Sequence, residues 1–207
     1  MATSYNNVGA VYSGKGELDK ALEYYIKSLT IRLSALGENH PDVAESYHNT
    51  ANVYREKGEL DDAIEYYMKS IIIHQQSLGT NDSRVAYSYC ELGLTSRLQG
   101  SLAKADEYLN KSLIIYRVTL GENHPHFAET MKNKALVYQD RWELDSAFYH
   151  HNEALAIRLN IYGEHHPAVA ESYNHLGDVY RLQGELDMAC VCISSSIELR
   201  TEMLGAS

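Results

Sequence analysis

The sequence predicts an all-α protein, a right-handed α-solenoid of five helix-turn-helix units with ten antiparallel helices. Two observations predict this class. The chain of 207 residues repeats itself every 42 residues without an insertion. Within each repeat, apolar and aromatic residues recur at helical spacing, and no strand pattern is present. One helical hairpin cannot bury its own apolar face, so neighbouring hairpins must stack, with first helices on the concave side and second helices on the convex side.

Columns of identical residues define the repeat. Glycine recurs at Gly37, Gly79, Gly121, Gly163 and Gly205, and alanine recurs at Ala21, Ala63, Ala105, Ala147 and Ala189. Five steps of 42 make 210, close to the chain length, so the units are about 1–41, 42–83, 84–125, 126–167 and 168–207. We expect a single solenoid domain over 1–207 that is part of a longer chain or array. Its end at Gly205-Ala206-Ser207 lacks a polar capping helix, so we expect an exposed apolar end.

Each predicted element has a start and a stop. In the first unit, Tyr5, Val8, Val11 and Tyr12 predict a helix over about 3–15, which Gly16 ends. A second helix is expected over about 19–36, with Asp19 as its N-cap. The same N-cap role is expected in later units of Asp61, Asp145 and Asp187.

Two further positions concern the helix ends. A histidine precedes a proline at His40, His124 and His166, which implies a helix-start role, since proline fits a first turn. Trp142 stands in the column where Gly16, Gly58, Gly100 and Gly184 end the first helix. Because tryptophan at positive φ is strained, we expect that turn to end differently.

Composition excludes several classes of protein. Lys+Arg 18 against Asp+Glu 28 gives a net charge of −10, which opposes binding to a nucleic-acid backbone. No apolar run is long enough to span a membrane, and the first residues do not resemble a signal peptide. The three cysteines include no C-x-x-C pair, which favours a reducing, cytoplasmic setting.

No pattern predicts catalysis, a cofactor or a metal. The stretch GAVYSGKG over 9–16 nearly matches a phosphate loop, but Gly16 stands where a hydroxyl must hold Mg²⁺ and a helix precedes the loop. The histidines, His150, His151, His165 and His166 among them, lack a metal-ligand spacing. Cys190 and Cys192 face different sides of a helix, and Cys90 is expected to be a buried thiol. Most of the 17 tyrosines lie in repeat columns and are expected to pack between helices.

The repeat resembles a known family. The segment YNNVGAVYSGKGELDKALEYYIKSL is similar to the tetratricopeptide repeat (TPR), with Tyr5, Val8, Gly9, Tyr12, Gly16, Ala21, Tyr25 and Ser28 on its signature positions. The 42-residue period and the LGENHP loop resemble the long-helix subtype of kinesin light chains and nephrocystin-like proteins. The resemblance covers all 207 residues and implies a non-catalytic scaffold that binds a partner peptide or helix in a concave groove.

The resemblance also implies which side chains contact the peptide, namely three first-helix positions. The second residue after the aromatic column is asparagine at Asn7, Asn49 and Asn133, and an amide can bond both backbone groups of an extended peptide. The residue after the later tyrosine is arginine at Arg55, Arg97 and Arg181, which can bind carboxylates bidentately. Adjoining positions of the groove hold His48, Asn52, Lys132 and Asn174.

The chain departs from kinesin light chains at one edge of this groove. Where those proteins tend to carry lysine, this chain has Thr3, Glu45, Tyr87, Glu129 and Glu171. A partner that carries both charges therefore fits better than a purely acidic one. Two alternatives stay open: a structural or oligomerisation module that self-associates through its convex face or solenoid ends, and a regulatory sensor arm of a larger multidomain enzyme.

Overall fold

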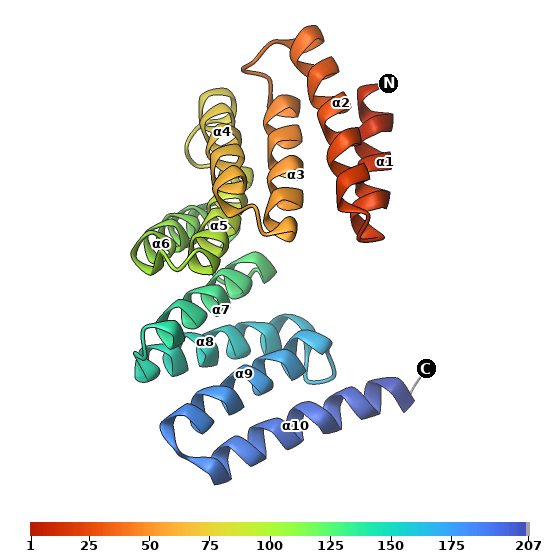
Figure 1. The fold of residues 1–207 in the computed structure, drawn as a ribbon. Helices are drawn as coiled ribbons and strands as arrows, with labels where there is room; N and C mark the ends of the chain where they lie inside the picture. Colours follow the sequence, from red (N-terminus) through yellow and green to blue (C-terminus); the bar gives the residue numbers. More distant parts are fainter. Residues whose placement is uncertain (206–207) are drawn as a thin grey trace. The chain divides into compact units, whose positions relative to one another are not determined.

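A computed structural model describes residues 1–205, and the final Ala206 and Ser207 lie outside the described residues. Over that range the chain forms ten helices and no strand, arranged as five helical hairpins of an all-α solenoid (Figure 1). The fold class is therefore the predicted one. None of these helices is long and apolar enough to cross a lipid bilayer.

The chain divides into two compact units, Met1–Ile115 and Tyr116–Ser207. The first contains α1 (Ala2–Gly14), α2 (Leu18–Leu36), α3 (Pro41–Lys57), α4 (Leu60–Leu78) and α5 (Ser83–Leu98), and most of α6 (Leu102–Thr119). The second contains α7 (Pro125–Asp140), α8 (Leu144–Tyr162), α9 (Pro167–Gln183) and α10 (Leu186–Gly205). The single domain over 1–207 stays a prediction.

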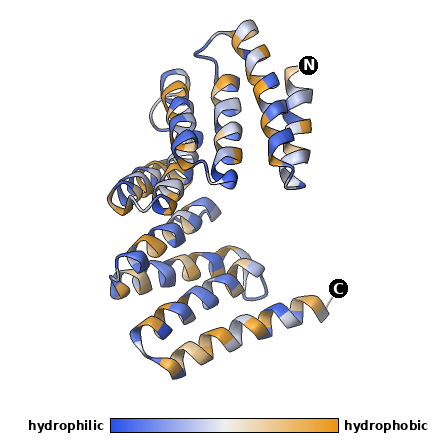
Figure 2. Ribbon diagram, in the orientation of Figure 1, coloured by the Kyte–Doolittle hydropathy of each residue, from blue (hydrophilic) through white to orange (hydrophobic). Residues whose placement is uncertain are grey.

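Small residues set the spacing between helices. The alanines of the repeat column are almost fully buried, and apolar residues recur along every helix (Figure 2). At Gly93 in α5, a Cβ atom would lie 2.7 Å from Leu109 of α6, so only glycine lets these helices approach so closely. The predicted packing role of the tyrosines is confirmed, since rings of paired helices meet, as in Tyr12 and Tyr24 with centroids 5.4 Å apart.

The predicted helix starts at histidine are confirmed. His40, His124 and His166 each precede a helix, and each Nδ1 accepts a hydrogen bond from the backbone N–H two residues on, at 3.1–3.2 Å. Asp82 caps α5 in the same way, because its carboxylate accepts a hydrogen bond from the Arg84 backbone N–H at 2.9 Å. A side-chain acceptor thus satisfies one of the unpaired N–H groups at each of these starts.

The expected N-cap role of Asp19 is wrong. Helix α2 begins one residue earlier, at Leu18, and Glu17 is the N-cap residue without a side-chain cap. Asp19 lies in the first turn instead, as do Asp61, Asp145 and Asp187 in their helices. There a carboxylate complements the positive end of the helix dipole without bonding a cap N–H.

The expectation that the turn at Trp142 ends differently is also wrong. Trp142 adopts a φ of 60°, the one positive φ of a non-glycine residue in the described chain. Its N–H bonds to the Gln139 carbonyl at 2.9 Å and that of Glu143 to the Tyr138 carbonyl at 2.9 Å. Gly58 and Glu59 make the same pair of bonds after α3. The turn after α7 therefore has the same geometry as the turn after α3, and Trp142 adopts the strained left-handed conformation that this geometry requires.

Candidate functional site

Side chains of α1, α3 and α5 are joined by hydrogen bonds on one side of the first unit, here called the first-helix face. Asn49 on α3 donates to the Asn6 side chain on α1 at 3.0 Å. Further along α3, Asn52 accepts from the Tyr67 hydroxyl of α4. The face is therefore a connected polar surface whose groups are already oriented.

Arg55 connects α3 to both neighbouring helices. Its Nε lies 3.4 Å from the Tyr67 hydroxyl, and its Nη2 lies 3.4 Å from the Glu91 carboxylate of α5. Burial raises the pKa of Tyr67 well above its usual range, and the Glu91 carboxylate raises it further. Tyr67 therefore stays protonated and remains a hydrogen-bond donor to Asn52.

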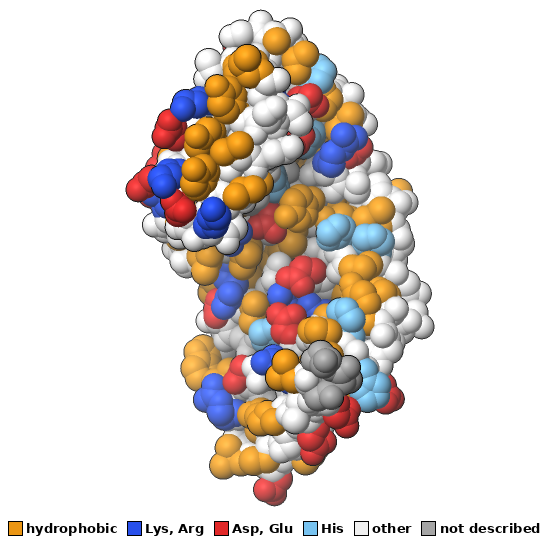
Figure 3. All heavy atoms as spheres, turned by 90° about the vertical axis from the view of Figure 1, so that its right-hand side faces the viewer, with side chains coloured by type: hydrophobic (Ala, Val, Ile, Leu, Met, Phe, Trp, Pro, Cys, Tyr) orange, Lys and Arg blue, Asp and Glu red, His pale blue; other side chains and the backbone are white. Residues whose placement is uncertain are grey.

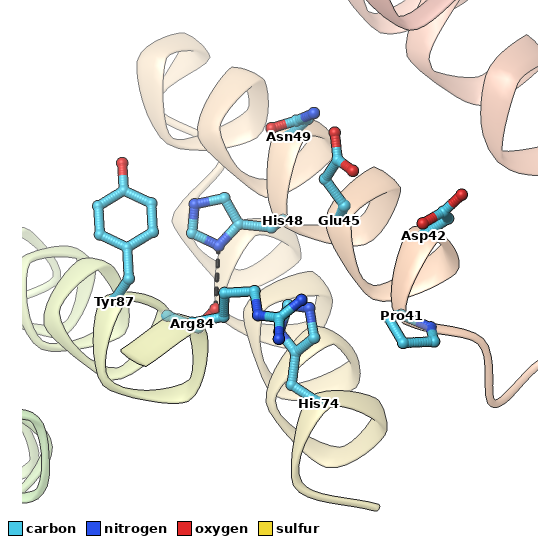
Figure 4. Close-up of a pocket in the computed structure, with 9 residues that line it drawn as sticks. Pro41, Asp42, Glu45, His48, Asn49, His74, Arg84 and Tyr87 are labelled. Carbon is cyan, nitrogen blue, oxygen red and sulfur yellow. Dashed lines mark hydrogen bonds between the residues drawn. The ribbon is translucent and has the colours of Figure 1, made fainter. Parts of the chain in front are cut away.

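A pocket of about 270 Å³ opens between α3, α4 and α5 (Figure 4). Its lining residues are Pro41, Asp42, Glu45, His48, Asn49, His74, Arg84, Tyr87 and Ser88. His48 and His74 are its most buried titratable groups, with 7% and 4% of their surface exposed. His48 Nδ1 lies 3.1 Å from the Ser88 hydroxyl, whereas His48 Nε2 and His74 Nδ1 have no hydrogen-bond partner among residues 1–205.

Both imidazoles of the pocket are held neutral. Burial, followed by the nearby His74 and Arg55, lowers the pKa of His48 to about 3. Burial, followed by the Arg84 guanidinium, lowers the pKa of His74, while Asp82 opposes that shift. Each ring therefore offers one N–H and one lone pair at neutral pH.

The second unit holds a cluster of charged groups around Arg158, which is only 4% exposed. Arg158 donates to the Ala168 carbonyl at 3.0 Å and to the Ser172 hydroxyl at 2.8 Å. Its guanidinium also pairs with Glu129 at 2.8 Å and with Glu171 at 3.1 Å. A hydrogen bond from His175, followed by the charges of Lys132 and Arg158, lowers the pKa of Glu171 to about 2.

Lys132 completes this cluster. Its side chain is 13% exposed, and its ammonium group lies 2.5 Å from Glu129 and 3.4 Å from Glu171. Two cations and two carboxylates thus neutralise one another between α7, α8 and α9. His151 lies beside them, stacked on His175 with centroids 5.0 Å apart. Within residues 1–205, no group of three or more His, Cys, Asp or Glu side chains is arranged to hold a metal ion.

The structure brings four predicted contact residues together on α3. His48 and Asn49 line the pocket, and Asn52 and Arg55 belong to the hydrogen-bonded network of the same face. Arg97 is half-buried in the last turn of α5. Asn7 is exposed on α1, and its neighbour Asn6 makes the bond to Asn49.

The remaining predicted residues lie in the second unit. Lys132 is engaged by its two carboxylates, and Asn133 beside it on α7 is buried. Asn174 is exposed on α9. Arg181 is exposed in the last turn of α9, with Asp178 3.6 Å away. Their role in binding a peptide stays a prediction.

Residues on second helices that reach across to a neighbouring first helix were not predicted from the sequence. Arg32, His74 and Arg158 occupy one column of the repeat. Arg32 Nη1 donates to the Asp42 carbonyl at 2.7 Å and the Ser46 hydroxyl at 2.8 Å, as Arg158 does to Ala168 and Ser172. The 42-residue period could have identified the column, because a buried arginine at a fixed step predicts a fixed partner.

These buried arginines also explain the acidic edge that distinguishes the chain from kinesin light chains. Glu45 lies 3.7 Å from Arg32, and Glu129 and Glu171 pair with Arg158. The space-filling view accordingly shows acidic, basic and histidine side chains intermixed on the visible surface (Figure 3).

The comparison with known families agrees with this architecture. The Tetratricopeptide repeat family matches residues 1–76, 51–117, 84–159 and 126–201, which together cover nearly the whole chain. The chain belongs to this family. TPR proteins generally mediate protein–protein interactions and generally serve as non-catalytic scaffolds.

Solved TPR structures are similar to this chain. BtubC (BKLC) from P. vanneervenii is 25% identical, with a TM-score of 0.83, over 95% of this chain and 78% of that one. A putative kinesin light chain with nearly identical TPR-like repeats from Podosopora anserina is 21% identical, with a TM-score of 0.80, over 97% of this chain and 95% of that one. The resemblance to kinesin-light-chain-like TPR proteins is thereby confirmed.

A third structure is that of the Rap conjugation gene regulator of the plasmid pLS20 in complex with the Phr* peptide. It is 18% identical, with a TM-score of 0.76, over 96% of this chain and 53% of that one. At this identity the likeness concerns the fold. No curated protein matches the sequence.

Proposed function

We propose that this TPR chain is a non-catalytic scaffold that recruits a partner protein by binding its extended peptide or helix on the first-helix face. The observation that carries the proposal is the pocket between α3, α4 and α5, which opens beside Asn49 on a face of oriented polar groups. A preorganised polar face suits an extended peptide, because its amide groups need partners along their whole length. The peptide-bound Rap regulator supports the same use of the fold.

The partner peptide should carry both positively and negatively charged side chains. Glu45 and Asp42 lie at the pocket, whereas Arg97 lies further along α5. A peptide with one sign of charge would meet like charge on part of this face, which costs affinity. We also propose a cytoplasmic location, since Cys90, Cys190 and Cys192 are free thiols.

Peptide-library panning tests the proposal directly. The face variant is Asn49→Ala with Tyr87→Ala, two half-exposed or exposed residues that line the pocket. The matched control is Met68→Ala with Ile72→Ala, two exposed residues of α4. We expect peptides to be enriched on the parent and the control and lost on the face variant, with helicity equal in all three. No enrichment, or loss on the control alone, contradicts the proposal.

Self-association is the second candidate, and exposed apolar residues on α10 favour it. Leu186, Val191 and Ile197 are all more than half exposed. Exposed apolar side chains along one helix can form an interface between copies. Sedimentation equilibrium should then show a mass that rises with concentration, and a Val191→Glu, Ile197→Glu variant should stay monomeric. A parent mass that equals the monomer mass at every concentration excludes this candidate.

A further inference from the structure

The pocket of the first unit and the charged cluster of the second occupy the same positions of the repeat. Adding 84, two repeat steps, to the pocket residues Glu45, His48, His74, Tyr87 and Ser88 gives the residues of the cluster. These are Glu129, Lys132, Arg158, Glu171 and Ser172, in that order. The two sites therefore allow a comparison of equivalent repeat positions that carry two different sets of side chains.

In the second unit, two cations of the chain itself fill this space. The Arg158 guanidinium bonds to the Ala168 carbonyl and the Ser172 hydroxyl, and Lys132 lies between the two carboxylates. The first unit has a shorter, neutral histidine at both positions, His74 and His48. The space that a buried arginine fills elsewhere is open here.

The acceptors for such a cation remain in place. Residues Arg84 and Ser88, whose carbonyl and hydroxyl correspond to the acceptors of Arg158, both line the pocket. Glu45 keeps its carboxylate, and its distance of 3.7 Å from Arg32 leaves it without a short hydrogen bond there. Two buried ring nitrogens, His48 Nε2 and His74 Nδ1, lack a hydrogen-bond partner within the described part of the chain. A buried polar atom without a partner is costly, so a donor that enters the pocket gains both contacts.

We propose that the pocket binds the guanidinium side chain of an arginine from the partner peptide, which takes the place that Arg158 fills in the second unit. This inference rests on the proposed function for the identity of its partner. A guanidinium brings only donors, and the pocket can present lone pairs of both imidazoles, Ser88 and Glu45. The volume of about 270 Å³ is below the roughly 300–1,000 Å³ of sites for whole small molecules, so it suits one side chain.

The charges around the pocket favour a cation over an anion. Arg84 is the one guanidinium among the lining residues, and Asp82 already neutralises it through two bonds of 2.9 and 3.0 Å. Asp42 and Glu45 add two carboxylates. The histidines add no positive charge, because burial lowers the pKa of each. A carboxylate ligand would meet these acids, whereas a guanidinium is attracted by them.

The test uses N-acetyl-arginine amide as a probe, with N-acetyl-glutamine amide and N-acetyl-glutamate amide for comparison. The readout is the imidazole ¹⁵N signals of His48 and His74 in the full chain. We expect the arginine probe to shift both sets of signals with saturation in the millimolar range, and the other probes to bind at least about tenfold more weakly. Equal shifts with the neutral probe, or tighter binding of glutamate, overturn the assignment.

A single substitution should close the pocket from within. His74→Arg restores the residue found at Arg32 and Arg158, so its guanidinium should occupy the site and reduce binding of the probe at least about tenfold. His165→Arg, on an exposed residue of the second unit, is the matched control and should bind like the parent. Glu45→Gln keeps the shape, removes one charge and should weaken binding even if His74→Arg folds poorly. Parent-like binding by both pocket variants refutes the proposal.

The two proposals fail separately. If enriched peptides lack a basic residue and bind His74→Arg as they bind the parent, the pocket assignment is wrong and the groove proposal stands. If the arginine probe binds but no peptide is enriched, the pocket stands and the groove proposal fails.

Discussion

Replacing Trp142 with glycine should stabilise the protein. Trp142 holds a φ of 60° in a turn that otherwise uses glycine, and its side chain is 70% exposed. A left-handed conformation costs an L-residue about 1–2 kcal/mol, which glycine avoids. The flexible glycine loses about 0.5–1 kcal/mol more in chain entropy on folding. The net expectation is a gain of about 0.5–1 kcal/mol, since an exposed ring contributes little packing.

A second variant separates the free-energy cost of the positive φ at residue 142 from the effect of removing the indole ring. Trp142→Ala removes the indole but keeps a Cβ atom at positive φ, so it retains the strain. The difference between the glycine and alanine variants should therefore be about 1 kcal/mol in favour of glycine. The mirror experiment, Gly58→Ala at a φ of 81°, should cost about 1 kcal/mol.

Urea denaturation followed by far-UV circular dichroism measures these differences, because it does not depend on tryptophan fluorescence. The slope of the transition should stay the same in all variants, so that midpoints compare directly. If the glycine variant is no more stable than the alanine variant, the backbone at this turn is not strained and the reasoning fails.

Three other outcomes follow from the packing and the charges. Gly93→Ala should cost about 1–3 kcal/mol in urea denaturation, because its Cβ would lie 2.7 Å from Leu109, whereas Gly14→Ala, with nothing within 4 Å, should not destabilise. Arg158→Met should cost about 3–5 kcal/mol, because it leaves two carboxylates without their buried cation, while the exposed Arg181→Met should change stability little; equal effects contradict this. The pKa of Glu171 falls from 4.5 to about 2 on folding, so its contribution is present above pH 4.5 and is lost as the pH falls through 2. Glu171→Gln should therefore flatten the dependence of the urea midpoint on pH in that window, and an unchanged profile would show that the ion pair is not stabilising.

The fold could be predicted closely because two kinds of pattern agree. The apolar spacing within each unit predicts helices, and the repetition of the unit predicts how those helices stack. The first two helices were expected over 3–15 and 19–36, and the structure has Ala2–Gly14 and Leu18–Leu36. The errors concern single residues that the surrounding fold overrides. Trp142 follows the turn of its neighbours because the stacked helices fix both ends of it, which a propensity for one residue does not report.

The candidate site could be predicted only in part. Asn49 and His48 were found from first-helix columns, and both line the pocket. The arrangement depends equally on His74, which comes from a second helix. The columns of first-helix residues contain no signal for a second-helix side chain that reaches across to the same pocket. Asn7 was expected to face the groove, but its neighbour Asn6 is the residue that bonds to Asn49. Which of the two faces α3 depends on the rotation of α1 about its axis, and the helical periodicity of the sequence defines that rotation only to within about one residue.

The unbroken 42-residue step has a consequence for how such a chain can evolve. Every hairpin has an alanine of the same column in nearly complete burial, from Ala21 to Ala189. Recombination out of register by one repeat therefore joins a surface to a close copy of its usual neighbour. Copy number can rise or fall by whole hairpins without a new interface, while point substitutions such as arginine to histidine give individual copies a separate chemistry.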